Sequence, residues 1–428
     1  MASERVPELA LLRSEAFPKL LTSARATFHG ARPTGRIVLV DALRGFALLG
    51  LFLVHCVEYF ELYWRHPEPS HIHNAVDFLF ADKAYAVFAL LFGYSFFLFI
   101  NGRGRRQADV SGRFAWRLLL LVAMGYFNSL IYVSDILQVL GLLGLSLLLF
   151  NRLGNRTLLI LSVMFLAHPH LLIHTFSALI SSEEGNKSQL YWMLYAKTAE
   201  VFAHGGFLDV VRLNLWQGQL FKWAYIFETA RISSLAALFI WGLLLGRIGF
   251  FTEPDRFLKQ RRWGILLSVM ASLLLHALLD FYNAASPMQS HAAAKLSLAN
   301  MLESWAALAM ATAGVLLFVE AFSLSLCRRF LALFAPCGQM SLTIYVGQGL
   351  LGVTVFYGFG LGWYQDMGQG RALFFGLGAF AAMMLFAHLW MRHYRYGPLE
   401  WLWRCGTYRS FDVPLRRQLS SRRRASAV

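Results

Sequence analysis

Charged residues are scarce in this sequence. Only 15% of its 428 residues are Asp, Glu, Lys or Arg, whereas 57% are hydrophobic, and the mean hydropathy is +0.50. A water-soluble domain of this length needs more polar side chains to cover its surface. The composition therefore excludes an ordinary soluble enzyme or binding module, and it favours a protein whose natural solvent is a lipid bilayer.

Cysteine is also rare. The four cysteines, Cys56, Cys327, Cys337 and Cys405, lack the spacing of metal ligands, and three of them fall in segments expected at the cytoplasmic face. A disulfide is not expected there, because the cytoplasm keeps thiols reduced. Residues 1–36 carry six Lys or Arg and lack the apolar core of a cleavable signal peptide, so the first membrane helix is expected to act as an uncleaved signal.

What the chain has in abundance is long apolar runs. They contain about 18 to 25 residues, roughly what an α-helix needs to cross a ~30 Å hydrocarbon core. We predict an all-α, polytopic integral membrane protein with about ten transmembrane helices, or eleven if 207–227 crosses the bilayer instead of lying at its surface. The ten predicted spans are 37–60, 76–100, 114–132, 135–150, 157–180, 230–250, 263–283, 299–326, 338–360 and 371–391.

The distribution of Lys and Arg tests this threading, because the cytoplasmic connections of membrane proteins are enriched in them. The connections assigned to one side, which include both ends of the chain, contain 28 Lys and Arg, and those assigned to the other side contain 6. The sequence therefore predicts that both termini lie in the cytoplasm and that 61–75 and 181–229 lie outside.

Three parts of the chain follow from this threading. They are a basic cytoplasmic segment, 1–36, a transmembrane domain, 37–391, and a basic cytoplasmic tail, 392–428. The formal net charge of +15 resides mostly in the connections, so no nucleic-acid partner is expected. The tail, which includes Arg416, Arg417 and the run 422–424, is instead expected to rest on the anionic inner leaflet.

Ionisable residues inside an apolar span are costly, so each is a candidate functional residue. Asp41 and Arg44 open the first span three residues apart and can pair on one helix face near the inner surface. His55 follows Arg44 by eleven residues, which puts both on the same face about 16 Å apart. Asp41 and Arg44 are candidate substrate-binding residues, and His55 is a candidate base. The alternative is an interfacial ion pair with a packing histidine.

A second polar cluster surrounds the start of the second span. It contains His66, His71, His73, Asp77, Asp82 and Lys83. Three histidines within eight residues could hold a metal ion, but no second ligand set stands at a helical spacing, so no metal site is expected. A histidine oriented by a carboxylate is the usual arrangement of a general base. His71, His73 and Asp82 are therefore catalytic candidates and Lys83 a binding candidate, with solvated loop histidines as the alternative.

The third cluster lies around the short connection between the third and fourth spans. Asn128 stands two helical turns before Asp135, and both are candidate substrate-binding residues. Asp135 could equally cap the N-terminus of the fourth span, because aspartate is a favoured cap. Gln348 in the ninth span is a further candidate. These groups and several others gather toward the outer half of the spans and suggest a polar cavity that opens outward: His168, His170, His174, Glu228, Arg231, His276 and Asp280.

Five motifs in the chain resemble a known family. They are RIVLVDALRGFALLG (36–50), KAYAVFALLFG (83–93), SDIL (134–137), GQMSLTIYVGQ (338–348) and YGPLEWLWR (396–404). In this order and spacing they closely resemble the YeiB-type bacterial membrane proteins, and the similarity covers about residues 36 to 410. The resemblance implies residence in the bacterial cytoplasmic (inner) membrane.

That family resembles in turn a wider group of transmembrane acyltransferases. The group includes heparan-α-glucosaminide N-acetyltransferase and the enzymes that O-acylate bacterial surface polysaccharides. The resemblance implies that an acyl group is taken from cytoplasmic acyl-CoA and delivered to an acceptor on the far side. The polysaccharide acylases have an Arg, ten residues and a His, as Arg44 and His55 stand here. The heparan enzyme has Ala-Asp before a Gly, as Ala81, Asp82 and Gly93 stand here.

The chain also departs from the family pattern. YeiB-type proteins usually have Asn at the position of His55 and His at the position of Asn128, so the two side chains are exchanged here. Such an exchange is understandable if both positions line one pocket. The usual Asn before Tyr345 is Ile344 here. These departures affect which residue acts as the base.

The preferred hypothesis from the sequence is a transmembrane acyltransferase with acyl-CoA as donor and no metal. Arg44 would hold the anionic end of acyl-CoA, and His55 would deprotonate a glycan or small-molecule acceptor. Lys83, Asn128 and Gln348 would be donors to the oxyanion. The alternatives are a transporter or flippase of a small solute or lipid-linked substrate, for which no paired repeats are visible, and a structural protein. A homo-oligomer is compatible with each.

Overall fold

The computed structural model describes residues 37–68, 70–102, 107–180, 189–285 and 292–417. These residues are almost entirely helical, and the β-type pairing among them is one isolated bridge between Tyr394 and Arg416. The elements are α2 (Val38–Val57), η1 (Leu62–Arg65), α3 (His71–Phe80), α4 (Lys83–Ile100), α5 (Gln107–Ser129), α6 (Leu137–Gly144), α7 (Ser146–Phe150), α8 (Asn155–Leu166), α9 (Pro169–Ile180), α10 (Leu190–His204), α11 (Phe207–Glu228), α12 (Arg231–Ile248), η3 (Pro254–Phe257), α13 (Leu258–Ala285), α14 (Ala292–Ser323), α15 (Ser325–Leu331), η5 (Ala332–Phe334), α16 (Ala335–Gln339), α17 (Ser341–Phe356), α18 (Gln369–His393) and α19 (Pro398–Tyr408).

The described helices confirm a multi-pass membrane protein but not the predicted number of ten spans. Eight helices are long and apolar enough to cross a bilayer, and the bent pair of Ser325–Gln339 and Ser341–Phe356 makes a ninth if it counts as one span. Leu137–Phe150, where a tenth span was predicted, is a shorter apolar helix. The segment 207–227 forms α11, which is not among the candidate spans.

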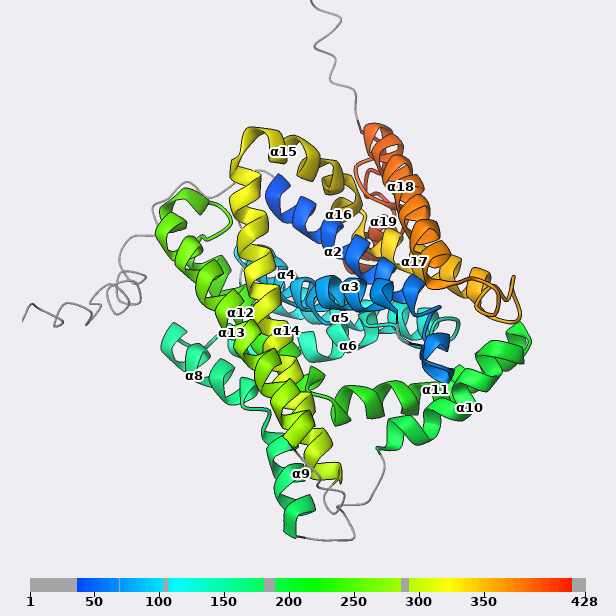
Figure 1. Ribbon diagram of the computed structural model, residues 1–428. Helices are drawn as coiled ribbons and strands as arrows, with labels where there is room; N and C mark the ends of the chain where they lie inside the picture. The colour runs from blue at the N-terminus through cyan, green and yellow to red at the C-terminus, as the bar shows by residue number, and fades with distance from the viewer. Residues whose placement is uncertain (1–36, 69, 103–106, 181–188, 286–291, 418–428) are drawn as a thin grey trace, which may run out of the picture.

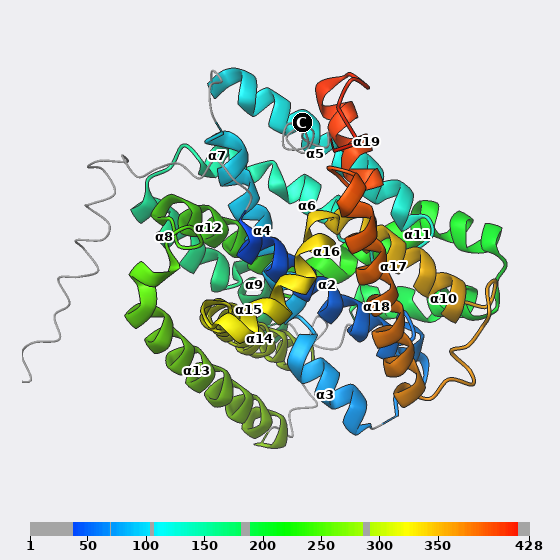
Figure 2. The ribbon, with the colours of Figure 1, turned by 90° about the horizontal axis from the view of Figure 1, so that it is seen from above.

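Helix α2 lies in the middle of the bundle (Figures 1 and 2). It packs against α3, α4, α16, α17 and α18, and its apolar window is the most buried of the candidate spans. Glycine permits the closest of these approaches. A Cβ at Gly338 would lie 1.8 Å from the carbonyl oxygen of Asp41, and a Cβ at Gly45 would lie 2.0 Å from that of Phe334. Small residues of this kind let membrane helices pack backbone to backbone.

The ninth predicted span, 338–360, is not one straight helix. The chain bends by 82° between α16 and α17, at Met340. The Glu400 side chain of α19 lies against the N-terminal end of α17: its Oε1 accepts hydrogen bonds from the backbone N–H groups of Leu342 at 2.6 Å and Thr343 at 3.1 Å. Its Oε2 accepts one from Thr343 Oγ1 at 2.6 Å. A carboxylate at a helix N-terminus satisfies otherwise unpaired donors and matches the helix dipole. The motifs 338–348 and 396–404 thus meet in space.

The described part of the basic tail is packed and not extended. Helix α19 lies along α5, where the indole N–H of Trp403 donates to the Arg117 carbonyl and that of Trp116 donates to the Gly406 carbonyl. The guanidinium of Arg117 stacks 3.7 Å from the centre of the Trp403 ring. The N-terminal segment 1–36 and the arginines at 422–424 lie outside the described residues.

Candidate functional site

A cavity of about 650 Å³ opens beside the C-terminal end of α2. Its wall is formed by the end of α2, by α3, α4 and the 134–136 connection, and by residues of α10 to α14 and α17. Six carboxylate side chains line it: Glu58, Glu61, Asp77, Asp82, Asp135 and Glu303. Three histidines, two lysines and one arginine line it as well. Ionisable groups at this density within apolar helices mark a candidate functional site.

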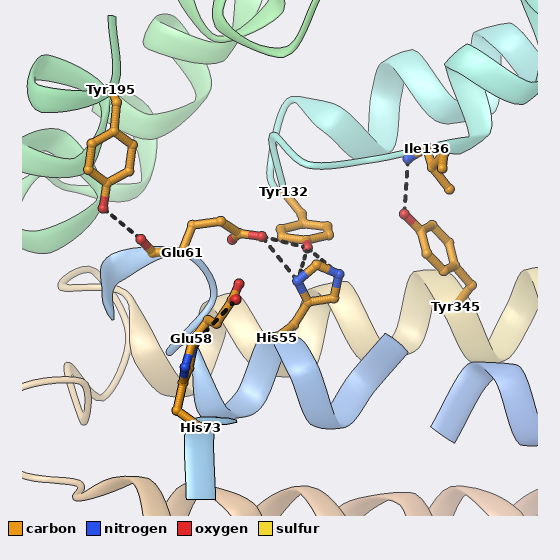
Figure 3. A network of polar contacts seen from close by, with 8 residues as sticks. All are labelled: His55, Glu58, Glu61, His73, Tyr132, Ile136, Tyr195 and Tyr345. Atoms are coloured by element: carbon orange, nitrogen blue, oxygen red, sulfur yellow. Dashed lines mark hydrogen bonds and ion pairs between the residues drawn. The ribbon is translucent and has the colours of Figure 1, made fainter. Parts of the chain in front are cut away.

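His55 lies in the wall of this cavity between a carboxylate and a phenol (Figure 3). Its Nδ1 is 3.1 Å from Oε1 of Glu61. The hydroxyl of Tyr132 is 3.0 Å from Nδ1 and 3.1 Å from Nε2 of the same ring, and it donates to Glu61 Oε1 at 3.0 Å. A carboxylate in this position fixes the orientation of the imidazole and stabilises its protonated form. The arrangement is one that can accept and release a proton.

The backbone places Glu61 in an unusual way. Tyr59, Phe60 and Glu61 follow the end of α2 with φ angles of 51°, 51° and 75°. Non-glycine residues rarely adopt this left-handed region, and each costs of order 1 kcal/mol or more. The turn reverses the chain so that the Glu61 side chain points back to His55, and Tyr195 of α10 fastens it by donating its hydroxyl to the Glu61 carbonyl at 2.7 Å. Strain of this kind concentrates at functional sites.

A second carboxylate and imidazole face each other in the same cavity. Nε2 of His73 is 3.7 Å from Oε1 of Glu58, and the His73 ring stacks on Tyr63 with 4.4 Å between ring centres. Within the described residues, His73 Nε2 and the second oxygen of Glu61, Oε2, are buried without a hydrogen-bond partner. Buried polar atoms of this kind are costly unless a substrate or water satisfies them. The cavity therefore offers unused hydrogen-bonding capacity on both sides of His55.

Asp135 contributes a buried carboxylate from the connection between α5 and α6. Asn128 donates to its Oδ2 at 2.7 Å, and the backbone N–H of Gln138 donates to its Oδ1 at 3.2 Å. Burial raises the pKa of Asp135 to about 6, because loss of solvent outweighs these hydrogen bonds and the charge of Lys222. Burial lowers the pKa of Lys222 to about 8, partly offset by Asp135, and its ammonium donates to the side-chain oxygen of Gln138.

Asp82 and Lys83 stand where α3 gives way to α4. Asp82 has a φ of 58°, which turns the chain sharply and directs its carboxylate to Arg231 of α12. The guanidinium of Arg231 also lies over the rings of Tyr85 and Tyr225, at 4.6 Å and 4.8 Å. Lys83 donates to the Asp77 carbonyl at 3.0 Å. These contacts give the cavity one wall that is rich in charge and aromatic surface.

The structure brings five of the predicted site residues together in the cavity: His55, His73, Asp82, Lys83 and Asp135. Asn128 is not among the lining residues and lies one hydrogen bond behind them, through Asp135. His71 is exposed at the first position of α3, away from the cavity lining.

The other predicted binding residues lie further along α2. Arg44 donates to Asp41 at 3.3 Å, to Ser95 Oγ at 3.0 Å and to the Gly338 carbonyl at 3.2 Å. The side-chain amide of buried Gln348 donates to the Leu48 carbonyl at 3.3 Å. None of these three binding candidates, Asp41, Arg44 and Gln348, is a lining residue of the cavity. They join α2 to α4, α16 and α17.

Sequence reasoning missed the residues that complete the site. Glu58 and Glu61 follow His55 by three and six positions, a spacing that indicates a carboxylate partner. Glu58 falls in the predicted span 37–60 and Glu61 in the connection 61–75, and neither was predicted as a site residue. Tyr132 and Lys222 come from distant parts of the chain, and no local signal indicates them. Glu303 is an ionisable residue inside the predicted span 299–326, which is a signal that could have indicated it. Within the described residues, no three His, Cys, Asp or Glu are grouped so as to hold a metal ion.

The fold and the cavity define a multi-pass helical membrane protein with a buried, charged site. Residues 245–410 match the family described as "Protein of unknown function (DUF418)", and residues 36–202 match "Heparan-alpha-glucosaminide N-acetyltransferase, catalytic". The chain is therefore similar to the YeiB-type family, and its N-terminal part is similar to the transmembrane acyltransferase group. His55, Glu61, Tyr132 and Asp135 all fall in the part that is similar to the acetyltransferase catalytic region.

Individual relatives align over most of the chain. The uncharacterized protein YxaH of Bacillus subtilis (strain 168) is 24% identical over 418 residues, covering 88% of this chain and 95% of the relative. A 39.9 kDa protein of Bacillus acidopullulyticus is 26% identical, covering 90% and 97%. The uncharacterized protein YeiB of Escherichia coli (strain K12) is 28% identical, covering 88% and 97%. The similarity therefore extends over the whole membrane domain.

Proposed function

We propose that the protein is a transmembrane acyltransferase that transfers an acyl group from acyl-CoA to a hydroxyl or amine of an acceptor. The observation that carries the proposal is the imidazole of His55, held by Glu61 and Tyr132 at the wall of the charged cavity. It lies within residues 36–202, which are similar to an acetyltransferase catalytic region. A carboxylate-oriented imidazole is what a general base for acyl transfer requires.

The reaction assigns each group a role. The Nδ1–H of His55 donates a hydrogen bond to Glu61, so that unprotonated Nε2 is the atom that takes a proton from the acceptor. The acceptor displaces the Tyr132 hydroxyl, which lies 3.1 Å from Nε2, as its oxygen or nitrogen attacks the thioester carbon. The tetrahedral intermediate collapses with cleavage of the C–S bond. The CoA thiolate then receives the proton from the His55 imidazolium and leaves as free CoA. Lys83, which lines the cavity, is the proposed donor to the oxyanion that forms on the carbonyl oxygen.

The donor is proposed to reach this site along α2. Arg44 is about 16 Å from His55 on the same helix, at the opposite end from the cavity, and is the proposed contact for the anionic part of acyl-CoA. Its guanidinium already bonds Ser95 and the Gly338 carbonyl, so the bound phosphate would add to an ordered group. The connections assigned to the membrane side at which α2 begins contain 28 Lys and Arg, so the end of α2 that carries Arg44 is proposed to face the cytoplasm.

The test separates binding from turnover. Purified protein in nanodiscs would be given radiolabelled acetyl-CoA, with glucosamine as the acceptor probe. We expect Arg44→Ala to weaken acetyl-CoA binding, and His55→Ala to leave binding nearly intact while lowering transfer by roughly 10²- to 10⁴-fold. His393→Ala, an exposed histidine on α18, is the matched control and should behave as wild type. No binding of acetyl-CoA, together with wild-type behaviour of both variants, would overturn the proposal.

A transporter is the second candidate, because the bend between α16 and α17 resembles the broken helices of transport sites. Glu400 and Thr343, which hold that break, do not line the cavity. The break therefore serves packing and not solute binding. Uptake of a solute into proteoliposomes that survives His55→Ala would favour transport over acyl transfer.

A further inference from the structure

One side of the cavity is formed by residues of three helices, α3, α13 and α14. Asp77 and Phe80 come from α3, His276 and Leu279 from α13, and Glu303 from α14. All three helices belong to candidate membrane spans. This side of the charged cavity is therefore built from helical segments that are long and apolar enough to cross a bilayer.

Helix α13 is the least covered of the candidate spans. Only 6% of its apolar window is buried, against 22% for the next lowest. It packs along α14, with Leu279 against Ala299 and Leu302, and lies at the outer edge of the bundle (Figure 2). Its other faces present large apolar side chains: Trp263, Leu266, Leu267, Met270, Leu274 and Phe281.

Helices α3 and α13 approach each other beside the cavity, at a ring contact that is called the mouth below. The rings of Phe78 and His276 lie 6.1 Å apart, centre to centre, and 42% of Phe78 is exposed. His276 is anchored by Nδ1 at 2.8 Å from the Ser272 carbonyl, while Phe78 and its neighbour Leu79 project outward from α3. The two rings are tilted by 58° and no hydrogen bond joins them, so little holds the two helices together at this point.

Building on the proposed function, we propose that the acceptor is a membrane amphiphile that enters sideways from the bilayer between α3 and α13. Its polar head lies in the cavity while its apolar chain stays against the exposed face of α13. The six carboxylates outnumber the three Lys and Arg in the lining, which favours a head group that is neutral or cationic. Asn300 supports this placement: it lines the cavity from α14, and its Nδ2 is buried without a partner within the described residues.

The experiment tests this route by joining α3 and α13 covalently at the mouth. In a background with the four native cysteines replaced, Phe78→Cys and His276→Cys would be bridged by a short bis-maleimide. The control pair, Gly264→Cys and Leu316→Cys, bridges α13 and α14 where they already pack, because a Cβ at Gly264 would lie 2.7 Å from Leu316. The probe is phosphatidylethanolamine with a photoactivatable, alkyne-tagged acyl chain, in phosphatidylcholine vesicles. Its head carries an amine.

We expect photolabelling of α13 and α14 peptides that line the cavity, reduced about tenfold by the bridge at the mouth and unchanged by the control bridge. A tenfold loss corresponds to about 1.4 kcal/mol of binding free energy. The unbridged cysteine pair should label at least as strongly as wild type, because removing the two rings opens the mouth, and a loss of label without the bridge would overturn the proposal. Equal labelling in both bridged proteins, or labelling spread evenly over all spans, would overturn the proposal.

Photolabelling needs no turnover, so its outcome is separate from that of the proposed function. His55→Ala should keep the label. If the protein bridged at the mouth still acetylates glucosamine but also keeps the lipid label, the sideways route is wrong and the enzyme stands. If no variant binds or consumes acetyl-CoA but the label depends on the mouth, the protein binds an amphiphile and the acyltransferase is wrong.

Discussion

Oε1 of Glu61 lies 3.1 Å from Nδ1 of His55, although Glu61 stands beyond the end of the helix that carries His55. Three consecutive left-handed residues bring it there. A sequence that needed only to end α2 would use glycine or a looser loop, because each such residue is strained. The fold therefore retains strain to hold a carboxylate against an imidazole inside an apolar bundle.

The first prediction concerns this pair. Glu61→Gln preserves the shape of the side chain and removes its charge, so the imidazolium of His55 loses its electrostatic support. We expect acetyl transfer to fall by roughly 10²-fold, with acetyl-CoA binding retained, as measured by radiolabel transfer and equilibrium binding. Glu58→Gln is the matched comparison, since Glu58 faces His73 at 3.7 Å and should matter less. A larger loss of acetyl transfer for Glu58→Gln than for Glu61→Gln would indicate that His73, and not His55, is the general base.

The second prediction uses the exchanged positions 55 and 128. Asn128 donates to Asp135 at 2.7 Å, and Asp135 lines the cavity. An imidazole at position 128 would meet a carboxylate there, just as His55 meets Glu61. We expect His55→Ala combined with Asn128→His to recover part of the transfer activity lost in His55→Ala alone.

Asp135 supplies the control for that exchange. Adding Asp135→Asn to the double variant should abolish the recovery, because the imidazole at 128 would lose its carboxylate. If recovery occurs without Asp135, the new histidine acts by another route. If His55→Ala alone retains full transfer, neither position carries the base.

The third prediction concerns pH. Because burial raises the pKa of Asp135 from 3.8 to about 6, the folded protein binds a proton that the unfolded chain has already released. This group therefore makes the free energy of unfolding fall as pH rises from about 4 to about 6, by up to about 3 kcal/mol. Asp135→Asn removes the titrating carboxyl, so thermal unfolding in detergent should become less dependent on pH between about 4 and about 6. The variant keeps a hydrogen bond at this position, because the side-chain amide of Asn128 can flip and bond the new amide. An unchanged profile would show that Asp135 is ionised throughout the range.

The sequence predicted the membrane fold well, because the thickness of the bilayer imposes a length on every apolar run. It also singled out His55 as a candidate base, since an imidazole inside an apolar span stands out. It could not locate the partners. Glu61 is directed to His55 by a left-handed turn that contains no glycine, so the sequence does not indicate the turn. Tyr132 comes from the end of another predicted span. These contacts depend on tertiary packing, which periodicity does not encode.

The bend at Met340 escaped prediction for a similar reason. The apolar run 338–360 reads as one straight span, and its break depends on Glu400, which lies about sixty residues further along the chain. The Arg44 position was predicted, but its contacts with Ser95 and the Gly338 carbonyl join three helices and could not be read from spacing. The role of Arg44 in binding acyl-CoA stays a prediction.

The fourth prediction tests the role of Glu400. Glu400→Ala removes the acceptor for the N–H groups of Leu342 and Thr343 and for Thr343 Oγ1. We expect a loss of about 2 kcal/mol in stability, because a helix cap and buried, charge-assisted hydrogen bonds are lost together. Thermal unfolding in detergent measures it. Glu253→Ala, which removes an exposed pair with Arg256 at 3.8 Å, should leave the midpoint unchanged. Equal unfolding midpoints for the two variants would show that the Glu400 cap does not stabilise the fold.

The last prediction concerns orientation in the membrane. The excess of Lys and Arg in one set of connections predicts that 181–229 lies outside the cell and the C-terminal tail inside. Lys197 of α10 and Arg417 are both exposed, so a cysteine at either position is reachable once the four native cysteines are replaced. A membrane-impermeant maleimide applied to intact cells should label Lys197→Cys and spare Arg417→Cys, and permeabilised cells should label both. Labelling of Arg417→Cys in intact cells would reverse the threading, and Arg44 would then face away from cytoplasmic acyl-CoA, which would remove the route proposed for the donor.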